Sequence, residues 1–357
     1  MLLRMQPDAS PEDIQAARSM LERLGYTTAP LAFLGPDRFA AVPSDDGTLL
    51  PVAEELTRWR AEGLLPAVAE MEALEGAALS SRARRPEGTR VRVGEVEIGG
   101  PEVVVMAGPC SVESLEQVLR TAEGARAAGA HLLRGGAYKP RTSPYAFQGL
   151  GRAGLEILAE VGARTGLPVV TEVMSPEEVP VVASYADMLQ VGARNMQNFA
   201  LLKRLGMLRK PVLLKRSPSA TLQEWLGAAE YLLARGNDQI VLCERGIRGF
   251  DPYTRNTLDV SAVPSVHELS HLPVVVDPSH GTGRRSLVAA GARAAVAAGA
   301  DGVCLEVHIR PEESISDREQ ALSPIELDDL MPSLRAIACA VGRRVRREIY
   351  CTTCRAV

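Results

Sequence analysis

Residues 132–145 concentrate side chains that bind anions. Their sequence, LLRGGAYKPRTSPY, contains Arg134, Lys139 and Arg141, followed by the hydroxyl of Thr142. Three cations this close together are costly unless an anion joins them, and arginine and lysine are common partners of phosphate. An apolar, strand-like run precedes them, and in parallel α/β folds ligands bind where strands end. The segment therefore predicts a site for phosphorylated small molecules.

Four further residues, far apart in the sequence, offer the donor atoms of a metal site. They are Cys110, His280, Glu306 and Asp317. One thiolate, one imidazole and two carboxylates suit a divalent transition metal. Taken singly, each has an ordinary structural explanation, such as a buried thiol, a helix cap or an ion pair. His308 lies two residues beyond Glu306 and would neighbour the metal or act as a further ligand.

Positively charged residues follow several of the same strand-like runs. The set consists of Arg134, Lys139, Arg141, Arg194, Lys215 and Arg245. One explanation is a ring of salt bridges, with Glu172 and Glu244 as partners. Six cations with few acids nearby fit phosphate or phosphoenol substrates better.

The elements that must position these residues form a repeating pattern between residues 103 and 342. Short runs that are apolar almost throughout, as strands buried on both faces should be, alternate with helix-like segments. The predicted strands are Val103–Met106, His131–Arg134, Pro168–Glu172, Met188–Val191, Pro211–Lys215, Gln239–Cys243, Pro273–Asp277 and Gly302–Val307. The clearest predicted helices are Leu115–Ala128, Gly151–Thr165, Leu222–Arg235 and Ser286–Ala298. Eight such units predict an α/β fold, a (β/α)8 TIM barrel, whereas the alternative, an open doubly wound sheet, would not need eight.

The residues before the barrel predict two smaller units. Residues 89–98 alternate around a glycine, which predicts a β-hairpin capping one end of the barrel. Upstream, the pattern predicts a small α+β domain of ferredoxin-like type. Its elements would be a strand at Leu2–Met5, a helix from Ser10 to Leu24 and strands at Thr27–Leu34 and Arg38–Val42, while residues 67–81 fit a helix or a strand. The predicted organisation is residues 1–80 for this domain, 81–88 for a linker, 89–342 for the barrel with its hairpin and 343–357 for a tail.

Composition excludes several classes of function. Of the 357 residues 46% are hydrophobic and the net charge is −4, which supports a large core and gives no general attraction to nucleic acid or anionic membranes. No apolar run approaches the ~20 residues that span a bilayer, and no signal peptide is recognisable. The six cysteines are scattered, so no disulfide framework is expected, and Cys351 and Cys354 are expected in a flexible tail. We therefore expect a cytoplasmic protein without nucleic-acid or membrane partners.

The motifs at the strand ends resemble those of the DAHP synthase family, where DAHP is 3-deoxy-D-arabino-heptulosonate 7-phosphate. They are AGPCSVES from Ala107, LRGGAYKPRTS from Leu133, GARN from Gly192, LLKR from Leu213, CERG from Cys243, DPSH from Asp277 and EVH from Glu306. The chain is most similar to the short microbial type with an N-terminal ferredoxin-like regulatory domain. The resemblance runs in unbroken order over residues 90–342 and is weak over residues 1–88.

This resemblance implies an enzyme that condenses phosphoenolpyruvate with erythrose 4-phosphate and releases phosphate, the first step of the shikimate pathway to chorismate and the aromatic amino acids. It implies a divalent metal of the Mn²⁺, Co²⁺, Fe²⁺ or Zn²⁺ class, no organic cofactor, an aromatic amino acid as effector, and a homo-oligomer, either a tetramer or a dimer. The implied roles are metal binding for Cys110, His280, Glu306 and Asp317, phosphoenolpyruvate binding for Arg134, Lys139, Arg194, Lys215 and Arg245, erythrose 4-phosphate binding for Arg141 and Thr142, and catalysis for Lys139, Cys110 and His280.

Three alternatives remain open at this point. The related 3-deoxy-D-manno-octulosonate 8-phosphate synthases use arabinose 5-phosphate, but typically carry KANRSS where this chain has KPRTS from Lys139. A Schiff-base aldolase would use Lys215 as the imine-forming amine. A non-enzymatic sensor would keep the barrel only as a scaffold, which the complete set of four metal-type ligands argues against.

Overall fold

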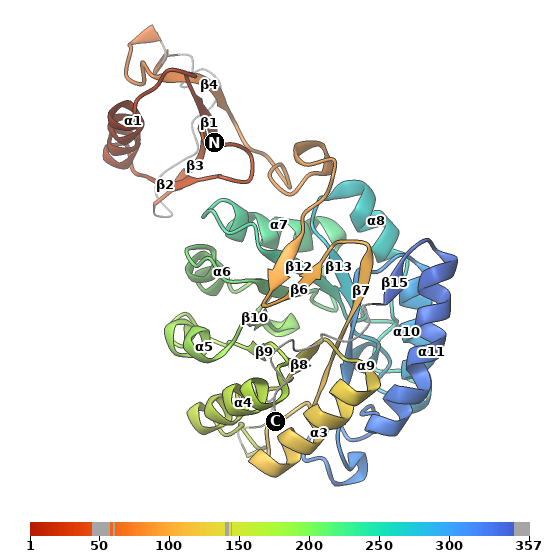
Figure 1. The fold of residues 1–357 in the computed structure, drawn as a ribbon. Helices are drawn as coiled ribbons and strands as arrows, with labels where there is room; N and C mark the ends of the chain where they lie inside the picture. The colour runs from red at the N-terminus through yellow and green to blue at the C-terminus, as the bar shows by residue number, and fades with distance from the viewer. Residues whose placement is uncertain (45–57, 60, 140–142, 144, 346–357) are drawn as a thin grey trace, which may run out of the picture.

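The computed structural model describes residues 1–44, 58–59, 61–139, 143 and 145–345. Its larger part is a closed barrel of eight parallel strands surrounded by helices (Figure 1). The strands are β7 (Glu102–Gly108), β8 (Leu132–Arg134), β9 (Val169–Glu172), β10 (Met188–Val191), β11 (Val212–Lys215), β12 (Ile240–Glu244), β13 (Val274–Val276) and β14 (Gly302–Glu306). Each strand pairs with its successor, and β14 pairs with β7 to close the barrel. All eight predicted strands and the predicted TIM barrel are confirmed.

Helices cover the outside of the barrel and bury their alanine-, leucine- and valine-rich faces against it. They are α3 (Leu115–Ala128), α4 (Arg152–Thr165), α5 (Val179–Tyr185), α6 (Phe199–Gly206), α7 (Leu222–Leu233), α8 (Ala262–Leu269), α10 (Arg285–Ala297) and α11 (Pro324–Ala340). Local signals set their ends. In α3, the side chain of Ser114 accepts the amide of Gln117, and Gly129 ends the helix with a left-handed φ of 105°.

A hairpin, β5 (Val91–Val93) and β6 (Val96–Ile98), closes the end of the barrel at which the strands begin. Its four apolar side chains share a buried cluster with the residues that point into the barrel, including Val104 and Met106. Because the hairpin occupies this end, the carboxyl ends of the strands remain for a ligand site.

The N-terminal residues form a separate antiparallel sheet with the order β2-β3-β1-β4, and helix α1 packs beside it. The elements are β1 (Leu2–Met5), α1 (Pro11–Arg23), β2 (Tyr26–Pro30), β3 (Arg38–Pro43) and β4 (Val68–Glu72). The side chains of Ser10 and Asp13 cap α1 reciprocally, and Leu3, Leu21 and Phe39 belong to its core. The strand predicted to reach Leu34 ends at Pro30, because the amide of Leu34 donates to the carbonyl of Leu31 in a turn.

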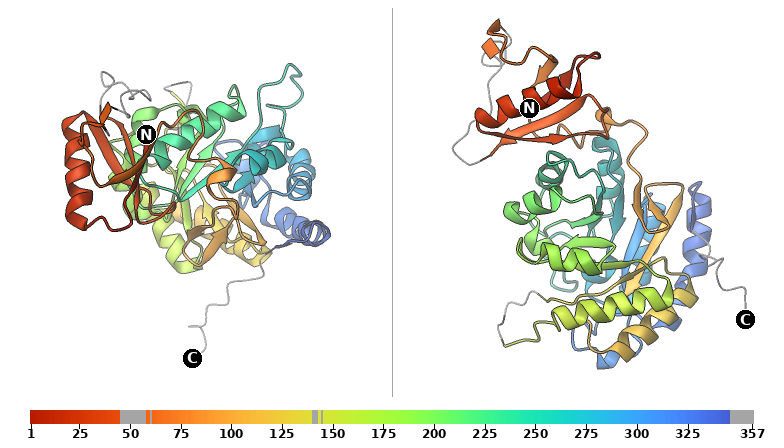
Figure 2. Two further views of the ribbon diagram at one scale, coloured as in Figure 1. Left: turned by 90° about the horizontal axis from the view of Figure 1, so that it is seen from above. Right: turned by 60° about the vertical axis from the view of Figure 1, so that its left-hand side comes forward.

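This sheet lies beside the barrel end that is remote from the strand carboxyl ends (Figure 2, right). The ring of Phe33 lies 6.3 Å from that of His271, which comes just before β13. The carboxylate of Glu230, near the end of α7, accepts the amides of Leu79 and Ser80 at 3.0 and 2.6 Å. Residues 79–89, which include the short helix η1 (Arg82–Arg84), thus pack on the barrel.

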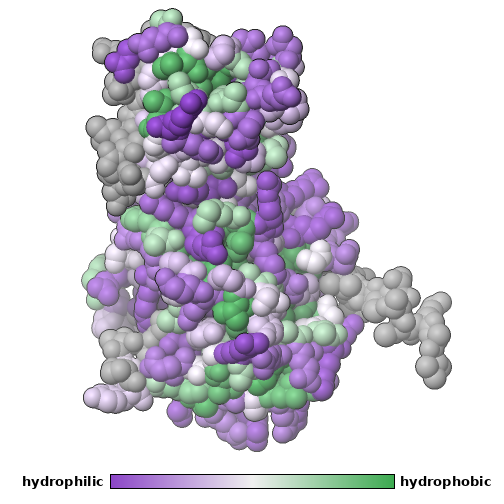
Figure 3. Space-filling model, turned by 90° about the vertical axis from the view of Figure 1, so that its left-hand side faces the viewer, coloured by the Kyte–Doolittle hydropathy of each residue, from purple (hydrophilic) through white to green (hydrophobic). Residues whose placement is uncertain are grey.

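Figure 3 shows one side of the molecule, on which hydrophobic side chains form separate patches between hydrophilic ones. Within the described residues, no helix is long and apolar enough to cross a membrane. A two-residue strand, β15 (Arg344–Val345), pairs with the start of β7, while Cys351 and Cys354 lie outside the described residues.

Candidate active site

The carboxyl ends of the barrel strands position the metal-type residues. Cys110 follows β7, His280 lies in a short helix after β13, α9 (Pro278–Thr282), and Glu306 is the last residue of β14. Asp317 comes from the loop between β14 and α11. The fold therefore brings four residues that are distant in sequence to one rim.

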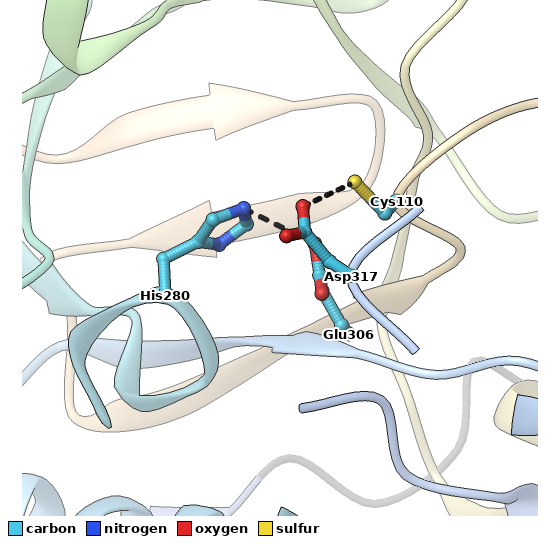
Figure 4. Close-up of side chains that lie close together, drawn as sticks. All are labelled: Cys110, His280, Glu306 and Asp317. Atoms are coloured by element: carbon cyan, nitrogen blue, oxygen red, sulfur yellow. Dashed lines mark hydrogen bonds and ion pairs between the residues drawn. The ribbon is translucent and has the colours of Figure 1, made fainter. Parts of the chain in front are cut away.

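These four side chains form one compact cluster (Figure 4). Each offers a ligand atom, and the four atoms lie within 4.8 Å of one another. The Sγ of Cys110 is 3.0 Å from Oδ2 of Asp317, and Nε2 of His280 is 3.1 Å from Oε1 of Glu306. Metal–ligand bonds of about 2.0–2.3 Å would place donor atoms around one ion at most about 4.6 Å apart, so the 4.8 Å bound on the metal-free cluster exceeds this limit only slightly. The donor set and its spacing therefore fit one divalent transition metal.

Neighbouring side chains orient two of these ligands. Asp277 caps α9: its Oδ1 accepts the backbone amide of His280 at 2.9 Å, and its Oδ2 lies 2.8 Å from the ring Nδ1. With the proton on Nδ1, the Nε2 lone pair of His280 faces the cluster. The side-chain amide of Gln320 donates to Oε2 of Glu306 at 2.7 Å. Such partners fix the direction of a ligand before an ion binds.

The protonation of the cluster follows from its burial. Burial, reinforced by the charge of Glu306, raises the pKa of Cys110 to about 12. The thiol is therefore protonated in the metal-free protein, and a coordinating cation would displace its proton. Burial opposes the charge of Asp317 as well, but His280, the Cys110 thiol and Arg255 together hold the pKa of this carboxyl below its usual value.

A cavity of about 580 Å³ opens beside the cluster, and seven basic side chains line it. They are Arg134, Lys139, Arg194, Lys215, Arg245, Arg248 and Arg255. His280 and Asp317 also line this cavity, so the cluster and the cations share one space. The buried Nε of Arg134 has no hydrogen-bond partner within the described part of the chain, which leaves a donor for a bound anion. The cavity therefore fits a small anion with several charges.

Three of the cavity's cations are bonded directly to metal-type ligands: Arg255 bonds to Asp317, and the other two are buried. The Nζ of Lys139 lies 2.9 Å from Sγ of Cys110 and 3.0 Å from the carbonyl oxygen of the same residue. An Nη of Arg134 lies 3.4 Å from Oε1 of Glu306. These cations would therefore contact both the ligands of a metal ion in the cluster and an anion in the cavity.

The environment of Lys215 decides against an imine-forming role. Its buried ammonium is bonded to Asp277, the carboxylate that also holds His280. Burial favours the neutral amine, but the charge of Asp277 outweighs it and raises the pKa of Lys215 above its usual value. A Schiff-base lysine needs a neutral amine, whereas a fixed cation suits the binding of an anion.

Not every predicted residue is found in this site. Arg141 and Thr142, predicted to contact the second phosphate, lie outside the described residues. His308, predicted beside the metal, is not part of the cluster. Its Nδ1 accepts the amide of Arg310 at 3.0 Å and its Nε2 lies 3.5 Å from Glu113. The strand β14 ends at Glu306, although the amides of Val307 and His308 continue to donate to neighbouring backbone carbonyls.

The two acids named in the salt-bridge alternative differ in their surroundings. Glu244 is paired with Arg216 at 2.9 Å. Glu172 lines the cavity and lies 3.4 Å from the side-chain amide of Gln190. Arg134 pairs with a residue of the cluster, Glu306.

Sequence reasoning did not assign a role to Arg248, Arg255, Asp277 or Gln320. Asp277 had a usable signal, because it stands three residues before His280, at the spacing of a helix N-cap. Arg248 and Arg255 lie in the loop between β12 and α8, where no local pattern marks an arginine as facing a cavity.

A barrel with a polar cavity at its strand ends is typical of one class of protein, the TIM-barrel enzymes. Comparisons with known proteins identify the family within this class. The model of the DAHP synthetase I family matches residues 80–338. The chain belongs to this family, and it is an enzyme.

Individual relatives agree with the family. The phospho-2-dehydro-3-deoxyheptonate aldolase of Thermotoga maritima is 43% identical over 97% of this chain and all of the relative. The crystal structure of a Thermotoga maritima protein of that name has a TM-score of 0.75 and covers 97% of this chain and 99% of its own. A truncated form of 3-deoxy-D-arabino-heptulosonate 7-phosphate synthase from that organism, 47% identical, covers 75% of this chain and 98% of its own, with a TM-score of 0.70. A 2-dehydro-3-deoxyphosphooctonate aldolase of Syntrophobacter fumaroxidans is 34% identical over 71% of this chain and 91% of the relative.

Proposed function

We propose that this enzyme condenses phosphoenolpyruvate with D-erythrose 4-phosphate to give 3-deoxy-D-arabino-heptulosonate 7-phosphate and phosphate. The observation that carries the proposal is a four-residue metal-type cluster opening on a cavity lined by seven cations, in a barrel of the DAHP synthetase I family. Both substrates carry phosphate, and one adds a carboxylate. A site rich in arginine and lysine can hold both in reacting positions.

The proposed reaction forms one carbon–carbon bond and breaks one carbon–oxygen bond. C3 of phosphoenolpyruvate attacks the aldehyde carbon, whose oxygen takes up a proton. Water adds at C2, and the resulting hemiketal phosphate loses phosphate. A divalent metal held by Cys110, His280, Glu306 and Asp317 would supply a Lewis acid toward the aldehyde.

The protein's own side chains have distinct proposed tasks. Arg134, Arg194, Lys215 and Arg245 hold the carboxylate and phosphate of phosphoenolpyruvate and offset their charge. Lys139, which lies between the cluster and the cavity, binds the same substrate and delivers the proton to the aldehyde oxygen. Arg141 and Thr142 contact the phosphate of the aldose.

The choice of aldose and the need for metal are tested in one assay. Phosphate release from phosphoenolpyruvate is measured with erythrose 4-phosphate or arabinose 5-phosphate, before and after EDTA. We expect release with erythrose 4-phosphate, loss of activity after chelation, and recovery with Mn²⁺ or Co²⁺. Faster release with arabinose 5-phosphate would instead assign the activity of the 2-dehydro-3-deoxyphosphooctonate aldolases, while full activity after exhaustive chelation would contradict the metal site.

We also infer that the N-terminal domain, residues 1–80, regulates the barrel by binding an aromatic amino acid, in a homo-oligomer that is a dimer or a tetramer. Removing residues 1–76 of it while keeping 77–89, of which Leu79 and Ser80 bond to Glu230 of the barrel, is expected to retain turnover and to abolish inhibition by tyrosine or phenylalanine. Inhibition curves compare the response of the full-length and shortened proteins to the amino acids, and light scattering compares their oligomeric states. Inhibition of the shortened protein equal to that of the full chain would contradict this role.

A further inference from the structure

Asp317 differs from the other three members of the cluster in how its backbone is held. Cys110, His280 and Glu306 stand at or just beyond the ends of barrel strands, whereas Asp317 belongs to a loop. Among the described residues it is the one non-glycine residue with a positive φ, at 55°. Aspartate tolerates this left-handed conformation, but the position is uncommon and needs support from its surroundings.

The side chain that supports Asp317 is Arg255. An Nη of Arg255 donates to Oδ1 of Asp317 at 2.9 Å, and the thiol of Cys110 is 3.0 Å from Oδ2. One carboxylate oxygen is thus held from the rim, and the other faces the cluster. The Arg255 side chain is 43% exposed, whereas that of Asp317 is 19% exposed, so the arginine reaches the aspartate from a more exposed position.

The backbone that carries Arg255 is fixed to the element that carries His280. The amide of Arg255 donates to the carbonyl of Thr282 at 3.0 Å, and the amide of Asn256 donates to the carbonyl of Gly281 at 3.0 Å. The side-chain amide of Asn256 also lies 3.3 Å from the carbonyl of His280. The backbone from which Arg255 reaches Asp317 is therefore already hydrogen-bonded to the helix that carries His280.

We propose that Arg255 is a positioning residue for the metal site: it holds Asp317 by one oxygen so that the other is directed at the ion. This inference rests on the proposed metal site. Hydrogen-bond partners of this kind raise the affinity of a site because they remove the freedom that a ligand would otherwise lose on binding.

The sign of the effect separates orientation from charge. A guanidinium near a divalent cation repels it, so a purely electrostatic role would make the site tighter when the arginine is removed. If Arg255 instead orients Asp317, removing the arginine makes metal binding weaker. The variant Arg255→Gln removes the charge and the fork of donors from a partly exposed position, where little disturbance of the core is expected.

The experiment is a titration of the full-length, chelator-treated enzyme with Mn²⁺ by calorimetry. We expect Arg255→Gln to weaken binding by about 10–100-fold. Arg248→Gln, which changes another arginine of the same loop and cavity, is expected to leave the Mn²⁺ affinity within about 2-fold of the wild type. Circular dichroism would confirm that each variant is folded, and Arg255→Lys provides a second, charge-conserving variant that is expected to weaken binding less than the glutamine.

A double-mutant cycle shows whether Arg255 acts through Asp317. In an Asp317→Asn background, Arg255→Gln is expected to change the Mn²⁺ affinity by less than about 2-fold. An equal loss in both backgrounds, or an unchanged or tighter affinity in the single variant, would overturn the role of Arg255. If the wild-type protein itself takes up no Mn²⁺, Co²⁺, Fe²⁺ or Zn²⁺, it is the proposed metal site that fails.

Discussion

Replacing Cys110 with serine is expected to lower kcat/KM by about 1,000-fold or more and to remove tight metal binding. The hydroxyl can still accept a hydrogen bond from Lys139, so the change mainly removes the thiolate from a set of four donors. A metal that stabilises a developing charge contributes several kcal/mol, and about 4 kcal/mol corresponds to this factor. Turnover and Co²⁺ binding, followed through the thiolate-to-cobalt charge-transfer band, measure the two effects.

The matched control is Cys339→Ser, because Cys339 is exposed on α11 and is not part of the cluster. It is expected to leave turnover and the cobalt spectrum unchanged. A Cys110→Ser enzyme that kept the charge-transfer band would show that another thiol coordinates the ion, and one that kept full activity would contradict a catalytic role for the metal.

The residues that sequence reasoning found are those whose signal is local. Cys110, His280 and Glu306 each follow a run of apolar residues, and the end of such a run predicts a position on the rim of a barrel. Asp317 was found by resemblance and because it follows the last strand. The confirmed barrel makes these positions converge, since parallel strands that close on themselves share one carboxyl end.

Apart from Asp277, the residues that were missed depend on contacts between distant segments. Arg255 bonds to an aspartate 62 positions later, and neither residue's neighbours in sequence reveal the pairing. The same limit explains why the sequence of residues 67–81 fits both a helix and a strand. The strand β4 contains alanine, glutamate and methionine, which favour helices, but its pairing with β1 decides the structure.

His308 shows the limit of a periodicity argument. Two residues apart on a strand means the same face, but His308 is not among the four clustered residues. Its Nδ1 accepts the amide of Arg310, and its Nε2 lies 3.5 Å from Glu113. Periodicity can place a side chain on a face of the strand, but the contacts that the side chain makes there depend on other segments.

Replacing Lys139 with methionine is expected to lower kcat at saturating substrates by about 10²–10⁴-fold, the usual contribution of a general acid. The Nζ of Lys139 is 2.9 Å from Sγ of Cys110 and also lines the cavity, so this ammonium lies beside a proposed metal ligand and faces the space proposed for the substrates. Methionine keeps most of the buried volume and removes the proton donor. Lys203→Met, on α6 and away from the cavity lining, is the control and should leave kcat unchanged.

Steady-state kinetics and direct binding of phosphoenolpyruvate separate the two tasks proposed for Lys139. A variant that bound phosphoenolpyruvate poorly but turned over at the wild-type rate when saturated would show that Lys139 only binds the substrate. A variant that bound it well and turned over slowly would place the proton transfer on this residue, because the remaining arginines suffice to hold the anion.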